Sequence, residues 1–283
     1  MSSAPQPSDT EPLRLLPPRS LEWPPRDDPR AGLESREIVG MRVDATSYDD
    51  AVARILEWAN RGESRYVCAA CVNNVIEAHD DEAYRTYMNG ADLVTPDGMP
   101  LVWGLRMLGA GESSRVYGPD LTEALCERAA RAGVPVGFYG GAPDVLDDLL
   151  VACKRRWPDL RVAYHLSPPF RPLTAEEEGR IVEDINASGA RILFVGIGTP
   201  KQDMWMARNR GRVQAVMLGV GAAFDFIAGR KSQAPDFLQS AGMEWLFRLL
   251  TEPKRLWKRY LYRNPRYVAL FGAQVLRDRF STR

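Results

Sequence analysis

Residues 191–203 read Arg191-Ile-Leu-Phe-Val-Gly196-Ile-Gly198-Thr-Pro-Lys-Gln-Asp203, an apolar run that passes through two glycines into a helix start. A short run of β-branched and aromatic residues predicts a buried strand. Thr199 suits a helix N-cap, and Pro200 suits the first helical position. Strand, glycine turn and helix start form the repeating unit of a parallel α/β sheet.

The same alternation recurs along the chain from Ile38 onward. Helical periodicity separates strand candidates at Ile38–Val43, Tyr66–Val72, Ala91–Thr95, Val134–Tyr139, Arg161–His165, Arg191–Val195 and Val213–Val220. Thr174-Ala-Glu-Glu177 is a capping-box pattern, and we expect its helix to end at Ser188-Gly189. The pattern predicts an α/β fold with a Rossmann-like, mostly parallel sheet and helices on both faces.

Composition divides the chain into three parts. Residues 1–37 hold eight of the 21 prolines and little periodicity, which predicts a disordered N-terminal arm. Residues 38–243 are predicted to form the Rossmann-like catalytic domain. Residues 244–283 are predicted to form a basic amphipathic helical appendage that associates with a membrane.

Charge is distributed unevenly, although the formal net charge is zero. Residues 244–283 contain ten Lys or Arg and three acidic residues, a net charge of +7, which leaves −7 on residues 1–243. A neutral chain has no general nucleic-acid footprint, so no nucleic-acid partner is predicted. A basic end on an acidic body instead indicates an anionic membrane surface as partner. No apolar run is long enough to span a bilayer and no secretory signal is seen, so we expect a peripheral protein at the cytoplasmic face of the cell membrane.

The basic tail also has helical periodicity. Apolar and aromatic residues recur from Leu246 to Leu261 with basic residues between them. Such a helix can lie in a bilayer interface with its aromatic residues at headgroup depth. Amphipathicity alone also fits a surface helix packed on the protein core.

Cys68-Ala-Ala-Cys71 matches a redox or zinc pattern by spacing. The pair lies in an apolar strand candidate, where residues three apart point to opposite faces. The chain has no second such pair and only two histidines. A structural role is therefore favoured over a metal site.

Residues that follow strands deserve inspection because ligands of open parallel sheets bind at the carboxyl ends of the strands. Asp97 follows one strand candidate within Pro96-Asp97-Gly98, which is also a common turn pattern. Gly140 and Gly141 follow another, where small residues would let a helix N-terminus approach phosphate. Asp97 is a functional candidate, and the two glycines are candidate substrate contacts.

Two later turns add further candidates for substrate binding. Gly196, Gly198 and Lys201 follow the strand quoted first, and Gln202 either reciprocates the Thr199 cap or contacts substrate. Asp225 lies among apolar residues after the last strand and needs a partner, which a nucleobase or ribose could provide. The chain lacks a G-x-G-x-x-G fingerprint, a Walker A loop and an Asp-x-Asp motif. No cofactor and no metal site are predicted.

Several segments in register resemble the WecG/TagA/CpsF glycosyltransferase family from about Ile38 to Arg266. They are Thr95-Pro-Asp-Gly, Arg115-Val-Tyr-Gly118, Gly196-Ile-Gly-Thr-Pro-Lys-Gln202, Gly219-Val-Gly-Ala-Ala-Phe-Asp225 and Glu244-Trp-Leu. The resemblance implies inverting, metal-independent transfer of N-acetylmannosamine, its uronic acid or a related sugar. The implied donor is a UDP-sugar, and the implied acceptor is an undecaprenyl-diphosphate-linked sugar used in cell-surface polysaccharide or teichoic acid synthesis.

The resemblance also implies roles for individual residues. Asp97 would be the general base, with Gln202 and Asn73 as further catalytic residues. Cys71 replaces the threonine usual in the family and is kept as a substrate-binding candidate, and Arg115 would line the same pocket. The appendage would bring arginines to the diphosphates, and the matching positions here are Arg248, Arg255 and either Lys258 or Arg259.

Two alternatives remain open on the sequence. One is a nicotinamide-dependent oxidoreductase on the same sheet, and the other is a non-enzymatic peripheral membrane adaptor. One chain does not determine oligomeric state, so a homo-oligomer also stays open.

Overall fold

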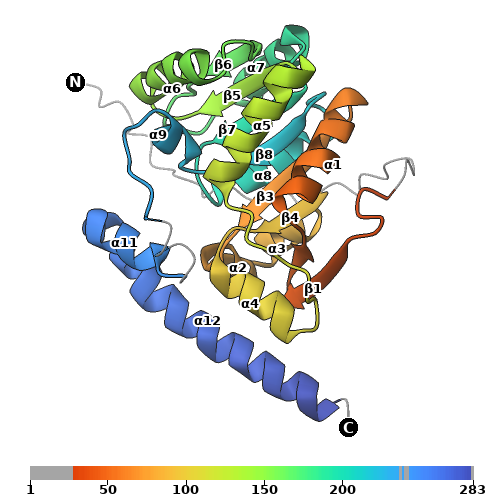
Figure 1. Ribbon diagram of the computed structural model, residues 1–283, viewed down its shortest axis with the longest axis vertical. Helices are drawn as coiled ribbons and strands as arrows, with labels where there is room; N and C mark the ends of the chain where they lie inside the picture. The colour runs from red at the N-terminus through yellow and green to blue at the C-terminus, as the bar shows by residue number, and fades with distance from the viewer. Residues whose placement is uncertain (1–27, 236–237, 239–241, 282–283) are drawn as a thin grey trace, which may run out of the picture.

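A computed structural model describes residues 28–235, 238 and 242–281, without the side chains of Arg255, Lys258, Arg259 and Ser281. Its centre is a six-stranded parallel sheet in the order β4-β3-β8-β7-β5-β6 (Figure 1). The strands are β3 Arg65–Ala70, β4 Leu93–Pro96, β5 Val136–Gly140, β6 Val162–Leu166, β7 Ile192–Gly196 and β8 Val216–Gly219. The predicted parallel α/β sheet is confirmed.

Helices cover both faces of the sheet. One face carries α1 Tyr48–Asn60, α5 Gly118–Ala132, α6 Pro143–Arg156 and α9 Ala223–Ile227. The other face carries α2 Val72–Asp80, α3 Glu82–Asn89, α4 Met99–Met107, α7 Ala175–Ser188 and α8 Lys201–Asn209. Strand β7 shows why both faces are apolar: Ile192 and Phe194 enter one core, and Leu193 and Val195 enter the other.

The first expected strand is a hairpin and does not belong to the parallel sheet. Strands β1 Glu34–Ile38 and β2 Met41–Ala45 pair antiparallel through a two-residue turn. Both turn residues have positive φ, 53° at Val39 and 82° at Gly40, as a tight hairpin turn requires. The sequence did not reveal this reversal, because residues 38–43 are mostly apolar and resemble one continuous strand. Strand β1 also begins before residue 37, the expected end of the arm, and residues 1–27 lie outside the described part of the chain.

Helix ends follow the sequence signals at α7. Its capping box joins Thr174 and Glu177, and Gly189 ends the helix with φ of 74°. At α8 the expectation was wrong, because Pro200 is the N-cap and the helix begins at Lys201. The Gln202 side chain is therefore available for contacts beyond the cap.

The appendage consists of α11 Glu244–Thr251 and α12 Pro253–Ser281, which runs along one end of the body (Figure 1). Tyr267 and Phe271 on α12 are buried and pack close to Gly104 of α4. Arg266 pairs with Asp80 of α2 at 2.5 Å. One side of α12 is thus packed on the protein, as the core-packing alternative expected. No helix in the described ranges is long and apolar enough to cross a membrane.

Candidate active site

Two adjoining hollows lie at the carboxyl ends of the strands. The sheet cleft, of about 410 Å³, lies beyond strands β3, β7 and β8 and is lined among others by Gly196, Gly198, Thr199, Gln202, Gly221 and Asp225. The appendage pocket, of about 110 Å³, lies beneath α11 and α12 and is lined among others by Asn73, Met99, Arg115, Trp245, Tyr260 and Arg263. Both hollows are lined by Cys71, Asp97, Tyr117 and Arg248. These four residues form the wall that the hollows share.

Asp97 is held firmly in this wall. Its backbone N–H donates to the carbonyl of Ala70 at 2.8 Å, and its carboxylate accepts from the N–H of Gly118 at 3.0 Å. Burial raises the pKa of the Asp97 carboxyl to about 6, against the opposing effect of Arg115. Gly98 has an ordinary φ of −107°, so the backbone there does not need glycine. The geometry favours a chemical role for Asp97 over a simple turn.

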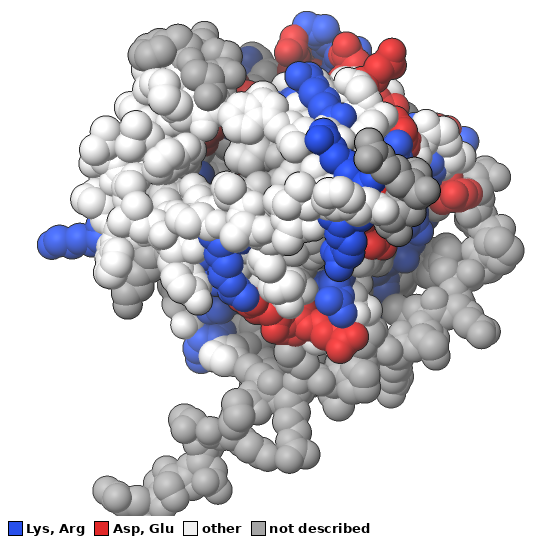
Figure 2. All heavy atoms as spheres, turned by 90° about the horizontal axis from the view of Figure 1, so that it is seen from below, with Lys and Arg blue, Asp and Glu red and all other residues white. Residues whose placement is uncertain are grey.

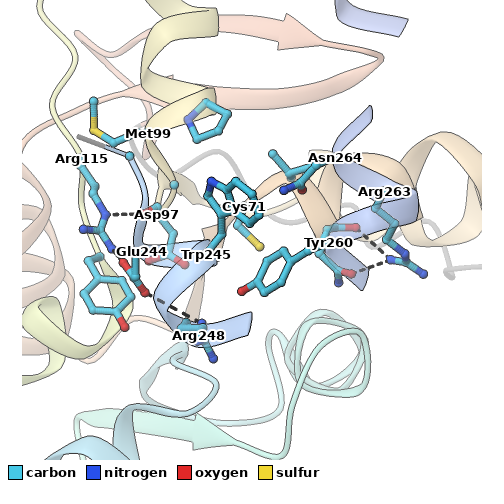
Figure 3. A pocket seen from close by; sticks show the side chains of 16 residues that line it. Cys71, Asp97, Met99, Arg115, Glu244, Trp245, Arg248, Tyr260, Arg263 and Asn264 are labelled. Atoms are coloured by element: carbon cyan, nitrogen blue, oxygen red, sulfur yellow. Dashed lines mark hydrogen bonds and ion pairs between the residues drawn. The ribbon is translucent and has the colours of Figure 1, made fainter. Parts of the chain in front are cut away.

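Arg115 connects the wall to the appendage (Figure 3). Its Nε donates to the Asp97 carbonyl at 2.7 Å, its guanidinium lies 4.2 Å from the centre of the Tyr117 ring, and its Nη2 pairs with Glu244 of α11. The expectation that Arg115 lines the pocket of Asp97 matches this placement. Glu244 was quoted in a family segment but was given no role by the sequence.

Arg248 projects from α11 between the two hollows. Its Nη1 lies 4.0 Å from Glu244, and its guanidinium lies 6.0 Å from the centre of the Phe226 ring. Its Nε is buried and has no hydrogen-bond partner among the described residues. A largely buried cation whose Nε donor is unused is suited to an anionic group of a ligand.

Gln202 and Asp225 line the sheet cleft as expected, but the groups that they contact differ from those that the sequence indicated. The buried Gln202 side chain accepts from the N–H of Gly221 at 3.2 Å and does not reciprocate a helix cap. Asp225 is not in an apolar setting, since Lys231 lies 3.4 Å away and the carboxylate is 30% exposed. Its partner in this state is therefore the Lys231 ammonium.

Some candidate contacts lie elsewhere. Gly140 and Gly141 have positive φ, and a Cβ at Gly140 would lie 2.5 Å from the Gly196 backbone. Gly140 allows β5 to pack closely on β7, a Cβ at Gly141 would lie 3.3 Å from Phe224 of α9, and neither glycine lines either hollow. Lys201 is exposed and lines neither hollow, whereas Gly196 and Gly198 line the sheet cleft. The predicted substrate contacts of Gly140, Gly141 and Lys201 thus have no support from their placement.

Asn73 and Cys71 lie at the start of α2. Asn73 accepts from Arg263 of α12 at 2.7 Å in the appendage pocket. The Cys71 thiol contacts Asn74 at 3.3 Å. The four cysteines are free, and the described residues contain no group of three potential metal ligands of the His, Cys, Asp and Glu types. The side chains of Arg255, Lys258 and Arg259 lie outside the described residues, so their expected contacts with diphosphate stay predictions.

Sequence reasoning did not single out Tyr117, Trp245, Tyr260 or Arg263 as site residues. Trp245 and Tyr260 have ring centres 6.0 Å apart and face the pocket from the appendage (Figure 3). For Trp245, Tyr260 and Arg263 the available signal was the aromatic and cationic density of the tail, which we interpreted mainly as a membrane-binding surface, and Tyr117 lies within a family segment. The appendage is therefore part of the site wall.

A parallel sheet with a carboxylate in a cleft at its strand ends is typical of α/β enzymes that bind nucleotides. The chain belongs to the glycosyl transferase WecG/TagA/CpsF family, whose model matches residues 36–281. The protein is thus a glycosyltransferase of cell-surface polymer synthesis, and the family suggests a sugar-nucleotide donor and a lipid-linked acceptor. This membership favours a transferase over the oxidoreductase and adaptor alternatives.

Proposed function

We propose that the protein transfers a hexose-type sugar, N-acetylmannosamine, its uronic acid or a related sugar, from a UDP-sugar to an undecaprenyl-diphosphate-linked sugar. The main observation in support is that the Asp97 carboxylate lies in the wall between the two hollows. One hollow would hold the donor and the other the acceptor, which brings the reacting atoms together at Asp97. The product would extend a lipid-linked glycan for polysaccharide or teichoic acid synthesis.

The sheet cleft is assigned to the donor. It lies at the carboxyl ends of parallel strands, the usual nucleotide position in open α/β sheets. Gln202 and Asp225 supply polar groups for ribose or base, and binding at Asp225 would compete with its Lys231 pair. Arg248 reaches the same cleft with its unused Nε, where it can neutralise the UDP leaving group.

The appendage pocket is assigned to the acceptor. Trp245, Tyr260 and Met99 provide an apolar and aromatic wall, and Arg115 and Arg263 provide cations. This mixture suits a sugar diphosphate on a lipid chain. Asn73 would orient the acceptor through its amide, whose oxygen Arg263 holds.

The reaction is a single displacement. The Asp97 carboxylate takes the proton of the acceptor hydroxyl, whose oxygen then bonds to the anomeric carbon of the donor. The bond from that carbon to the UDP oxygen breaks on the opposite face, so the anomeric configuration inverts. Guanidinium groups stabilise the departing diphosphate, and the proposal requires no metal.

The membrane contact is proposed to involve α4, α11 and α12. These helices carry exposed apolar residues, namely Trp103, Met107, Trp245, Leu246, Leu250, Trp257, Leu261, Tyr262 and Val268. Figure 2 shows a broad uncharged surface at this end of the molecule, crossed by Lys and Arg side chains, with acidic side chains toward its margins. Apolar residues interspersed with cations suit the interface of an anionic leaflet. The protein would lie on the cytoplasmic face of the membrane.

Transfer is tested by incubating the full chain with a panel of UDP-sugars and a polyprenyl-diphosphate-linked sugar, with EDTA present. A lipid-linked product longer by one sugar, with inverted anomeric configuration by NMR, supports the proposal. Absence of product with every donor, or release of free sugar and UDP only, contradicts it.

Membrane binding is tested by sedimentation with vesicles that contain anionic lipid. Leu261→Glu, which places a charge on an exposed part of α12, should reduce the bound fraction. Val151→Glu changes a similarly exposed apolar residue of α6 and serves as the control. Equal binding by both variants and the parent protein would rule out this surface.

A further inference from the structure

Glu244 carries a negative charge from the appendage into the site. It lies in the first turn of α11, pairs with Arg115, and interacts by a side-chain hydrogen bond with Tyr117. Arg248 lies one helical turn further and 4.0 Å away. The Glu244 side chain is only 14% exposed. One carboxylate thus lies beside two guanidinium groups, those of Arg115 and Arg248, in a place largely removed from solvent.

Glu244 does not engage every donor of Arg248. Arg248 has an ion-pair distance to Glu244 but no hydrogen bond from its buried Nε within the described chain. Arg115 and Arg248 together carry two positive charges, and Asp97 and Glu244 carry two negative charges when ionised. A diphosphate that entered beside these cations would bring at least two further negative charges next to Glu244. Like charges in such a confined place repel strongly.

We propose that Glu244 is an internal anion that pairs with Arg115 and Arg248. The substrate diphosphate displaces Glu244 when it binds. This inference rests on the proposed function. Glu244 can withdraw because it is attached to the appendage, whereas Asp97 is fixed by β4 and by the N–H of Gly118. Displacement releases Arg248, which lines the donor cleft, to the diphosphate of UDP, whereas Arg115 lines only the acceptor pocket. Only a ligand whose phosphates reach Arg248 must displace Glu244, so Glu244 weakens the binding of UDP more than that of a ligand that does not reach this arginine.

The same arrangement predicts a change at Asp97. The groups that act on its carboxyl are Arg115 beside it, Glu244 and Arg248 from α11, and the Gly118 N–H from α5. The negative charge of Glu244 raises the pKa of Asp97 in the unliganded protein. Removing that charge should move the acidic limb of kcat/KM to lower pH, because kcat/KM reports the free enzyme.

The experiment compares Glu244→Gln with the parent protein by calorimetric titration of UDP, UMP and inorganic pyrophosphate at pH 7.5. Glutamine keeps the size of the side chain and removes its charge. We expect about fivefold tighter binding of UDP and pyrophosphate, the effect of removing a partly buried competing ion pair. UMP lacks the second phosphate and should tighten less, so the ratio of UDP to UMP affinity should rise, and the acidic limb of kcat/KM should move to lower pH.

Asp80→Asn is the matched control. It removes another carboxylate that links body and appendage, through Arg266, but it lies outside both hollows. If Glu244 served only to fasten the appendage, Glu244→Gln and Asp80→Asn would weaken UDP binding alike and leave the pH limb unchanged. That result would overturn the inference, as would unchanged UDP affinity in Glu244→Gln.

A second variant keeps the test decisive if Glu244→Gln does not fold. Glu244→Asp keeps the charge and withdraws it from Arg115 by one methylene, so its UDP affinity should exceed that of the parent protein. Weaker or equal binding by this variant would contradict the inference. A parent protein that binds neither UDP nor pyrophosphate would overturn the proposed function itself, which separates the two failures.

Discussion

Lowering the pH should reduce the rate of sugar transfer because Asp97 becomes protonated, at a pH where an ordinary aspartate stays ionised. The pKa of Asp97 is raised to about 6, mainly by burial, with Arg115 opposing and Glu244 adding to the shift. A general base works only in its ionised form, so activity should rise with pH through this value. The ionised fraction falls from about 0.99 at pH 8 to about 0.09 at pH 5, a loss of about tenfold. An aspartate with a pKa of about 3.9 would stay more than about 90% ionised at pH 5.

The assay is kcat/KM for sugar transfer at limiting donor between pH 5 and 8, at constant ionic strength. Asp203 is the essential control, because burial raises the pKa of this second carboxyl to about 6 as well. Asp203 lies within the protein, where its carboxylate accepts from the Tyr84 hydroxyl at 2.7 Å. The acidic limb should persist in Asp203→Asn and disappear in Asp97→Asn, which should retain only a low rate. A limb near pH 4 in the parent protein, or a limb near pH 6 that survives in Asp97→Asn, would refute the reasoning.

Two further predictions concern stability. Asp203 has a folded pKa above its unfolded value, so its contribution to stability is full below about pH 4 and lost as pH rises through about 6. We therefore expect the free energy of unfolding of Asp203→Asn, minus that of the parent protein, to rise by an amount on the order of 3 kcal/mol from pH 4 to pH 8 in urea unfolding. A difference that does not vary with pH would contradict this. Gly140→Ala should lower the free energy of unfolding by more than about 2 kcal/mol, because its Cβ would lie 2.5 Å from the Gly196 backbone at a φ of +125°. Gly133→Ala has positive φ but open space and should cost only about 1 kcal/mol, so equal losses would show that the close approach is not the cause.

Most of the parallel sheet was predictable because each strand carries its own local signal. Buried on both faces, β7 reads as a continuous apolar run, and the glycines after it mark the turn. The hairpin was missed because Val39 and Gly40 reverse the chain inside such a run. Periodicity does not report where a strand turns back when the turn residues are themselves apolar or small.

The candidate site was predictable to the extent that it lies at strand ends. Asp97, Gln202 and Asp225 follow strands, so topology alone brings them to one edge of the sheet. The pairing of Arg115 with Glu244 joins residues 129 positions apart through tertiary packing of the appendage. Likewise, the sequence indicated that Asp225 needs a partner, but only the fold shows that this partner is Lys231. Gly140 and Gly141 have the composition of a phosphate loop, yet close packing explains them, of Gly140 against β7 and of Gly141 against Phe224 of α9.

The central claim is that Asp97 acts as the base between a donor in the sheet cleft and an acceptor in the appendage pocket. Its most direct test is the rate of a single turnover at pH 7.5, with saturating UDP-sugar and lipid acceptor, for the parent protein and Asp97→Asn. We predict a rate lower by about 10²- to 10⁴-fold in the variant, with UDP affinity little changed. A variant rate within a fewfold of the parent rate would contradict the account.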